Sequence, residues 1–144
     1  MEDRHLCKAR PIGTRKQWVI GFYAVLGEKT VIIVNKPEKF YDVDNEKNSH
    51  GNKIVEVIPK TVCQCTGCND KNGKLIFEND ILSGHIDDEF PEDETRKRVV
   101  WHENGWCTNE PGCDDYEELD DFDSENFEVI GNMINNPELL EVRL

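Results

Sequence analysis

The run from Val57 to Leu82 constrains the fold more than any other part of the chain, because two apolar, β-patterned stretches flank a turn within it. The turn is Asp70-Lys71-Asn72-Gly73, and its Asn-Gly pair supplies the positive φ angles that a tight hairpin requires. Residues 78–80 then swing the chain from one short strand into the next, as at the corner of a barrel. The run therefore predicts a fold of short, closely connected strands.

Similar strand patterns recur along the rest of the 144-residue chain, separated by turn residues. Gly27-Glu28 and Glu103-Asn104-Gly105 each join two apolar stretches, and so predict two further hairpins. Pro137 stands where a proline begins a short C-terminal helix. The pattern favours a mainly β barrel or sandwich, because no helical segment alternates with the strands. The other strands are expected at 17–26, 30–34, 54–58, 99–102, 106–108 and 127–133.

Long polar segments separate these strands. Those at 41–53, 87–98 and 110–124 are expected to be exposed loops. Residues 110–128 hold ten acidic residues and no basic one. The length suits one domain, in which we expect an N-terminal hairpin lobe at 1–56 and a barrel portion at 57–144 with acidic insertions.

The negative charge of the chain is confined to its second half. Residues 1–86 hold 13 Lys and Arg against 11 Asp and Glu, a net +2, while residues 87–144 hold 4 against 19, a net −15. Such a surface repels the nucleic acid backbone and acidic membranes, and it attracts a basic protein. We therefore expect a protein partner and neither nucleic acid nor membrane.

Two absences bear on the compartment. The first 18 residues contain no apolar run that fits a signal peptide, and no stretch approaches the roughly 20 apolar residues of a membrane span. A cytoplasmic protein is expected, and in such a compartment six cysteines are reduced thiols or metal ligands rather than disulfides.

Several separated blocks of sequence carry a family resemblance. The blocks are 18–19, 21–23, 58–62, Gln64, 66–67, 70–74, 76–82, 99–101, 104–105, 127–132 and 136–140. In this order they resemble the YopX-like proteins of phages and prophages. The resemblance implies a single small, mainly β domain over residues 1–144, with an SH3-like barrel component, self-association and no assigned activity. It brings no catalytic residue to this chain.

The chain departs from that family pattern at two places. Cys63, Cys65 and Cys68 occupy positions where such proteins commonly have a small residue, an aromatic one and an aliphatic one, so packing alone explains them. Asn79 stands where glycine is usual, and we expect the corner to survive because Asn tolerates the left-handed conformation.

The same cysteines also raise the possibility of zinc. A structural zinc site needs four ligands, and Cys65-x-x-Cys68 supplies one pair, with Cys63 beside it. The second pair would have to come from Cys107 with Cys113 or with His102, and neither combination has a tight knuckle spacing. We therefore expect no cofactor and thiols that bind no metal, with zinc as the alternative.

The resemblance implies a phage or prophage accessory protein, and the residues themselves do not predict an enzyme. The sequence contains no nucleophile motif and no phosphate-binding glycine loop. A non-catalytic module that binds a protein partner or assembles with its own copies is the first hypothesis. An acidic decoy, which imitates a polyanion and occupies a basic host protein in the cytoplasm, is the second, and a zinc-dependent protein is a distant third. The candidate interaction residues are Asp114, Asp115, Glu117, Glu118, Asp120 and Asp121.

Overall fold

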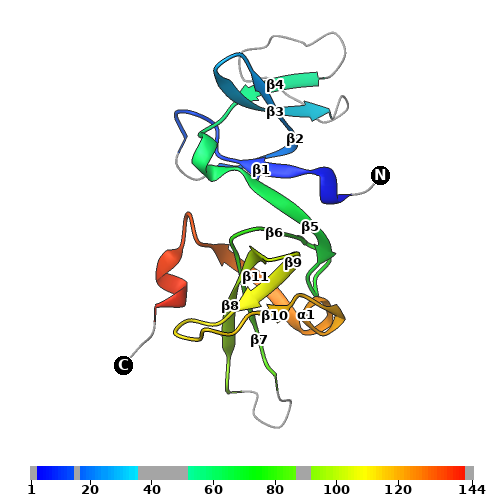
Figure 1. The fold of residues 1–144 in the computed structure, drawn as a ribbon, viewed down its shortest axis with the longest axis vertical. Helices are drawn as coiled ribbons and strands as arrows, with labels where there is room; N and C mark the ends of the chain where they lie inside the picture. Colours follow the sequence, from blue (N-terminus) through cyan, green and yellow to red (C-terminus); the bar gives the residue numbers. More distant parts are fainter. Residues whose placement is uncertain (1–2, 15–16, 36–51, 87–91, 142–144) are drawn as a thin grey trace. The chain divides into compact units, whose positions relative to one another are not determined.

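The structure, a computed structural model, describes residues 3–14, 17–35, 52–86 and 92–141, and it consists mainly of antiparallel strands (Figure 1). The predicted mainly β class is confirmed. The described strands form open sheets and no closed barrel, so the SH3-like component expected from the resemblance does not close. Most of the expected loop at 41–53, and the first part of the one at 87–98, lie outside the described residues.

The chain divides into two compact units, which we call the N-terminal unit (5–64) and the C-terminal unit (65–144 together with 1–4). The division falls within strand β5 (Cys63–Asn69), and hence inside the run 57–82. Cys63 therefore belongs to the N-terminal unit, whereas Cys65 and Cys68 belong to the C-terminal unit. A short 3-10 helix, η1 (Asp3–His5), precedes the first strand.

The N-terminal unit is built on an antiparallel sheet in the order β4-β3-β2-β1, to which the start of β5 adds by pairing with β1. Its core consists of buried Ala9, Ile32, Val34 and Val57. Gly21 is needed in β2, because a Cβ there would lie 2.3 Å from the carbonyl oxygen of Ile33. The elements are β1 (Cys7–Ala9), β2 (Val19–Leu26), β3 (Lys29–Asn35), β4 (Asn52–Glu56) and the 3-10 helix η2 (Pro59–Thr61).

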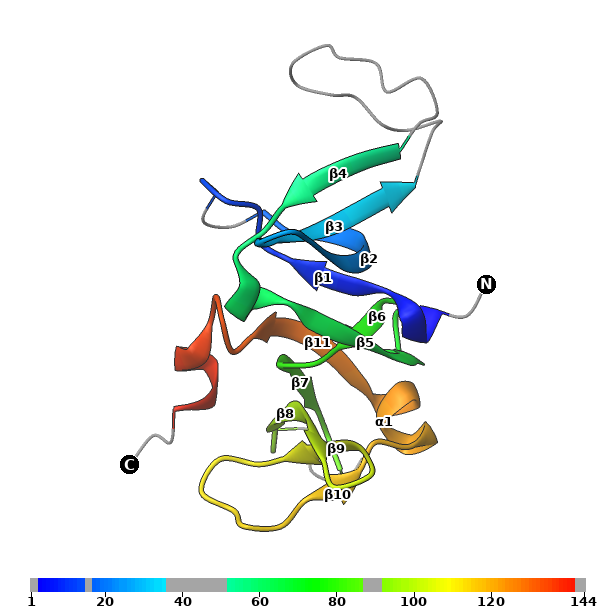
Figure 2. The ribbon, with the colours of Figure 1, turned by 45° about the horizontal axis from the view of Figure 1, so that its top comes forward.

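The C-terminal unit holds a five-stranded antiparallel sheet in the order β10-β9-β8-β7-β11 (Figure 2). The rest of β5 pairs with β6 in the same unit. The core of the C-terminal unit is formed by Ile76, Leu82, Val99, Leu119 and Phe127. The elements are β6 (Leu75–Phe77), β7 (Asp80–Gly84), β8 (Thr95–His102), β9 (Gly105–Asn109), β10 (Glu117–Glu118), α1 (Asp121–Asn126), β11 (Phe127–Asn132) and the 3-10 helix η3 (Pro137–Leu140).

The predicted turns lie where the sequence places them. Gly73 has a φ of 82°, and Asn79 holds the corner at 71°, in the left-handed region that was expected of it. The hairpin of β8 and β9 also forms, but His102 pairs with Gly105, so Gly105 lies in the strand. The positive φ of that turn, 57°, therefore falls on Glu103 and not on the Asn-Gly pair.

Candidate functional site

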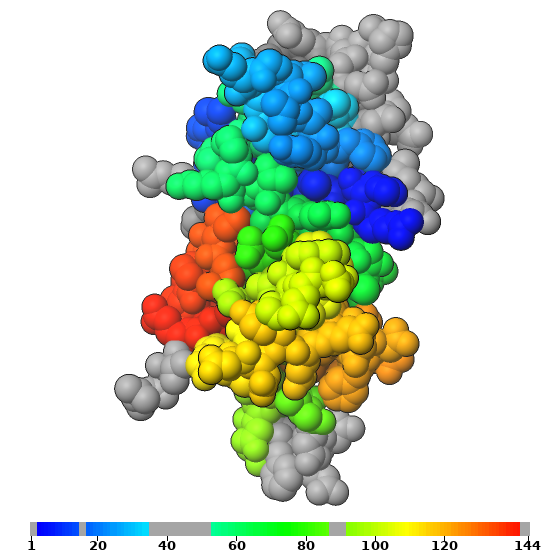
Figure 3. Space-filling view, in the orientation of Figure 1, coloured from blue at the N-terminus to red at the C-terminus, as the bar shows by residue number. Residues whose placement is uncertain are grey.

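The predicted interaction residues lie on one acidic segment of the C-terminal unit. All six are exposed, and Figure 3 shows the segment 110–121, coloured yellow to orange, at the surface. Asp114 and Asp115 lie in the connection before β10, Glu117 and Glu118 form β10, and Asp121 begins α1. We call residues 110–121 the acidic segment.

Local hydrogen bonds shape this segment. The side-chain amide of Asn109 donates to the carbonyl oxygens of Cys113 and Asp115, at 2.8 Å each, and so folds the connection against the end of β9. Asp120 is the N-cap of α1, and its carboxylate accepts from the backbone N–H of Asp123 at 3.2 Å. Asp120 therefore has a structural role besides its exposed charge, because a capping carboxylate satisfies a helix N–H that has no partner in the helix.

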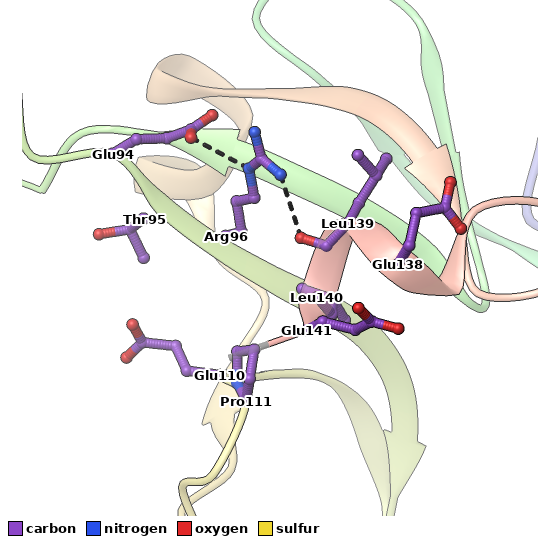
Figure 4. Close-up of a pocket in the computed structure, with 9 residues that line it drawn as sticks. All are labelled: Glu94, Thr95, Arg96, Glu110, Pro111, Glu138, Leu139, Leu140 and Glu141. Carbon is purple, nitrogen blue, oxygen red and sulfur yellow. Dashed lines mark hydrogen bonds and ion pairs between the residues drawn. The ribbon is translucent and has the colours of Figure 1, made fainter. Parts of the chain in front are cut away.

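A second acidic feature was not foreseen from the sequence. A pocket of about 400 Å³ is lined by Glu94, Glu110, Glu138 and Glu141, with Arg96 as the only Lys or Arg among its lining residues (Figure 4). Its walls come from the start of β8 and the residue before it, from the start of the connection after β9, and from η3 and the residue after it. These segments are far apart in the sequence. We call this pocket the glutamate pocket.

Arg96 is already engaged within this pocket. Its Nε donates to Glu94 Oε1 at 3.0 Å, and its Nη1 donates to the carbonyl oxygen of Leu139 at 3.1 Å (Figure 4). The pKa of Glu94 lies below its ordinary value of 4.5. The largest cause is the hydrogen bond from the Ser83 hydroxyl, and the next is the hydrogen bond from Arg96. The guanidinium thus offsets one carboxylate, while Glu110, Glu138 and Glu141 leave the pocket acidic.

Three of the candidate metal ligands line one other pocket. Cys68, His102 and Cys107 border a space of about 510 Å³ together with Trp106, Tyr116 and Leu119. The rings of His102 and Tyr116 stack with centroids 3.8 Å apart and planes 1° apart. Burial, followed by the charges of Glu118 and Glu103, raises the pKa of the Cys107 thiol. We call this space the ring pocket.

The other candidate cysteines are not among the lining residues of the ring pocket. Cys63 is buried and donates to the carbonyl oxygen of Thr61 at 3.3 Å, and Cys113 is exposed on the acidic segment. Cys65 is buried, its sulfur accepts from Gly67 N–H at 3.5 Å, and burial raises the pKa of its thiol. Within the described residues no cysteine is in a disulfide, and no group of three or more His, Cys, Asp and Glu side chains is placed to hold a metal ion.

The sequence could not indicate the apolar walls of the ring pocket. Trp106 is half-buried against the core, whereas Trp101, its cross-strand partner, is 54% exposed. Strand alternation gives both tryptophans the same face. They differ in their surroundings, because Trp106 packs against the core and its carbonyl oxygen accepts from the N–H of Leu119, in the acidic segment, at 3.0 Å.

Among the described helices, none combines the length and apolar character of a membrane crossing.

Comparisons with known proteins identify a family but no activity. The model of the family described as YopX protein matches residues 25–141 of the chain. No curated protein matches the chain. A crystal structure of protein EF1440 from Enterococcus faecalis is similar, with 21% sequence identity and a TM-score of 0.47, over 95% of this chain and 97% of that chain.

Proposed function

Because the chain belongs to the YopX protein family, as its sequence blocks predicted, we propose that it is a non-catalytic phage or prophage accessory protein that binds a basic protein partner through its C-terminal unit. One observation carries the proposal: the acidic segment is exposed, and the glutamate pocket adds carboxylates from two other parts of the chain. Both features lie in the same unit.

Charge is divided unequally between the two units. Residues 5–64 hold 10 basic against 6 acidic residues, a net +4, whereas residues 1–4 and 65–144 hold 7 against 24, a net −17. No Lys or Arg occurs between Arg98 and Arg143. A potential of one sign over a contiguous surface speeds the encounter with an oppositely charged protein and disfavours acidic ones.

The pKa of Glu94 disfavours a role of this residue as a general acid. A general acid among carboxylates needs a raised pKa, which burial or a neighbouring carboxylate supplies. Glu94 has the opposite shift, because Ser83 and Arg96 stabilise its charged form. A carboxylate whose charged form is stabilised suits the recognition of a cationic side chain.

A pull-down from host lysate at low and at raised salt tests the proposal. We expect a basic protein to be retained at low salt and released as salt screens the acidic surface. The variant carrying Glu117→Gln and Glu118→Gln should retain less of it. The control carries Glu28→Gln and Glu56→Gln, which remove the same charge from exposed positions of the N-terminal unit. Equal loss in both variants, or retention that does not depend on salt, would contradict a specific acidic surface.

The acidic decoy is the second candidate, favoured by the ten acidic and no basic residues of 110–128. A decoy occupies the nucleic-acid site of its target, whereas an interaction module need not. Once the partner is identified, competition between this protein and duplex DNA for that partner separates the two. Assembly with its own copies is tested by light scattering, in which a monodisperse monomer at high concentration contradicts it.

A further inference from the structure

The ring pocket lies beside an edge of the five-stranded sheet. Strand β10 pairs with β9 through Glu117 with Thr108 and Glu118 with Cys107, and it is the terminal strand of the sheet order. In the described part of the chain, no strand pairs with the other side of β10. A terminal strand presents backbone N–H and C=O groups to which another extended segment can add.

The ring pocket is lined by apolar as well as polar side chains. Leu119 is buried in the core of the unit, and Cys68 and Trp106 pack against that core. The stacked rings of His102 and Tyr116 complete the wall. A volume of about 510 Å³ falls within the roughly 300–1,000 Å³ usual for ligand pockets, and the side chains of Cys68, Trp106 and Leu119 favour contact with an apolar side chain.

The rim of the same pocket is acidic. Glu103 and Glu118 both line it, and Glu117 precedes Glu118 on the terminal strand. No Lys or Arg is among its lining residues, and Nε2 of His102 lies 3.8 Å from Oε1 of Glu103. A segment that adds to β10 would therefore meet the carboxylates of Glu103 and Glu118 beside the apolar side chains of the pocket. Opposite charges across neighbouring strands are stabilising.

We propose that the ring pocket binds the apolar side chain of an extended, lysine- or arginine-rich segment of the protein partner, and that this segment pairs with the open side of β10. The inference rests on the proposed function, because it specifies how the basic partner is recognised. The apolar side chain supplies affinity by leaving water, the backbone of β10 fixes the direction of the segment, and the rim selects its charge. An acidic or purely polar segment is disfavoured by the same surface.

Short synthetic peptides test the inference on the full-length protein. The probe is an acetylated pentapeptide with leucine between two lysines on each side, and its controls replace the leucine with glycine or the lysines with glutamates. Backbone NMR signals are followed during titration. We expect the leucine peptide to bind roughly tenfold more tightly than the glycine peptide, which is the effect of burying one aliphatic side chain. The shifts should centre on Cys107, Tyr116 and Glu118, and the glutamate peptide should not bind.

Two matched variants locate the binding. Tyr116→Ala removes one wall of the ring pocket, and Tyr23→Ala removes a comparably exposed tyrosine from the N-terminal unit. Only Tyr116→Ala should reduce the preference for leucine over glycine, with an unchanged unfolding midpoint showing that the fold is intact. Equal binding of the leucine and glycine peptides, or shifts confined to the glutamate pocket, overturns the inference while leaving an acidic interaction surface in place. If neither lysine peptide binds and the lysate retains no basic protein, the proposed function fails as well.

Discussion

The carboxylate of Asp70 accepts a hydrogen bond from the backbone N–H of Val129 at 2.9 Å, and so joins two positions 59 residues apart. Its other oxygen accepts from the N–H groups of Asn72 and Lys74, at 2.9 Å each, within the turn itself. The side chain is only 5% exposed. One residue thus closes the hairpin of β5 and β6 and holds β11 beside it.

Replacing Asp70 with alanine should be among the most destabilising single changes in the chain. Three backbone N–H groups would lose their acceptor, and we expect a loss of roughly 3 kcal/mol in the free energy of unfolding. Asp70→Asn keeps one acceptor oxygen in the turn but offers an amide to the N–H of Val129. We therefore expect a loss of roughly 1–2 kcal/mol in the free energy of unfolding. Urea denaturation of both variants measures this, and a neutral Asp70→Ala would contradict the role of the side chain.

Lys97 and Asp123 form an ion pair in the C-terminal unit, and both side chains are buried. Lys97 Nζ also lies 4.3 Å from the ring centroid of Phe127. Lys97→Met should cost about 3–5 kcal/mol, because it leaves a buried carboxylate without its cation. Lys74→Met, at an exposed lysine, is the matched control. Adding Asp123→Asn to Lys97→Met should recover part of the loss, and equal stability of the two lysine variants would exclude a structural role for the pair.

The lowered pKa of Glu94 predicts a dependence of stability on pH. The charged form of Glu94 is stabilised in the folded state, and the hydrogen bond from the Ser83 hydroxyl is the largest cause. The resulting contribution to the free energy of unfolding is therefore present above the ordinary pKa of 4.5 and is lost as pH falls through the lowered pKa. Ser83→Ala should raise the pKa of Glu94 toward its ordinary value, as measured by NMR titration of the carboxyl carbon. Ser124→Ala, in α1, should leave it unchanged. A Glu94 pKa that is the same in Ser83→Ala as in the wild type would show that the hydroxyl has no such effect.

Local signals predicted much of the fold. Asn79 and Gly73 carry the positive φ angles where the sequence places turns, since those conformations depend mainly on the residue itself. The turn at 103–105 illustrates the limit of this reasoning. There the pairing of His102 with Gly105 decides which residue takes the positive φ, and that register is set by the strands.

The candidate sites were less accessible from the sequence. The acidic segment is contiguous, so its composition revealed it. The glutamate pocket combines Glu94, Glu110 and Glu138 from three separated segments, and only the docking of η3 near β8 brings them together. The close spacing of Cys63, Cys65 and Cys68 suggested a metal knuckle, but the two buried cysteines have different hydrogen-bond partners and belong to different units.

Alkylation tests the expectation that the cysteines are thiols that bind no metal. At pH 8, iodoacetamide should label exposed Cys113 first and should label buried Cys63 and Cys65 only on unfolding, as followed by peptide mass spectrometry. Cys107 should react slowly, and its rate should continue to rise above pH 9.0, because its raised pKa keeps the thiol protonated at lower pH. Cys113→Ser should remove the fast phase and leave the others unchanged.

The same samples distinguish bare thiols from zinc ligands, because a thiolate bound to zinc is protected from alkylation until the metal is removed. We expect elemental analysis to find far less than one zinc per chain, and we expect a chelator to leave every labelling rate unchanged. Stoichiometric zinc, together with faster labelling of Cys65, Cys68 or Cys107 after chelation, would establish a metal site. Such a site would require side chains to move, since within the described residues they are not arranged to hold one.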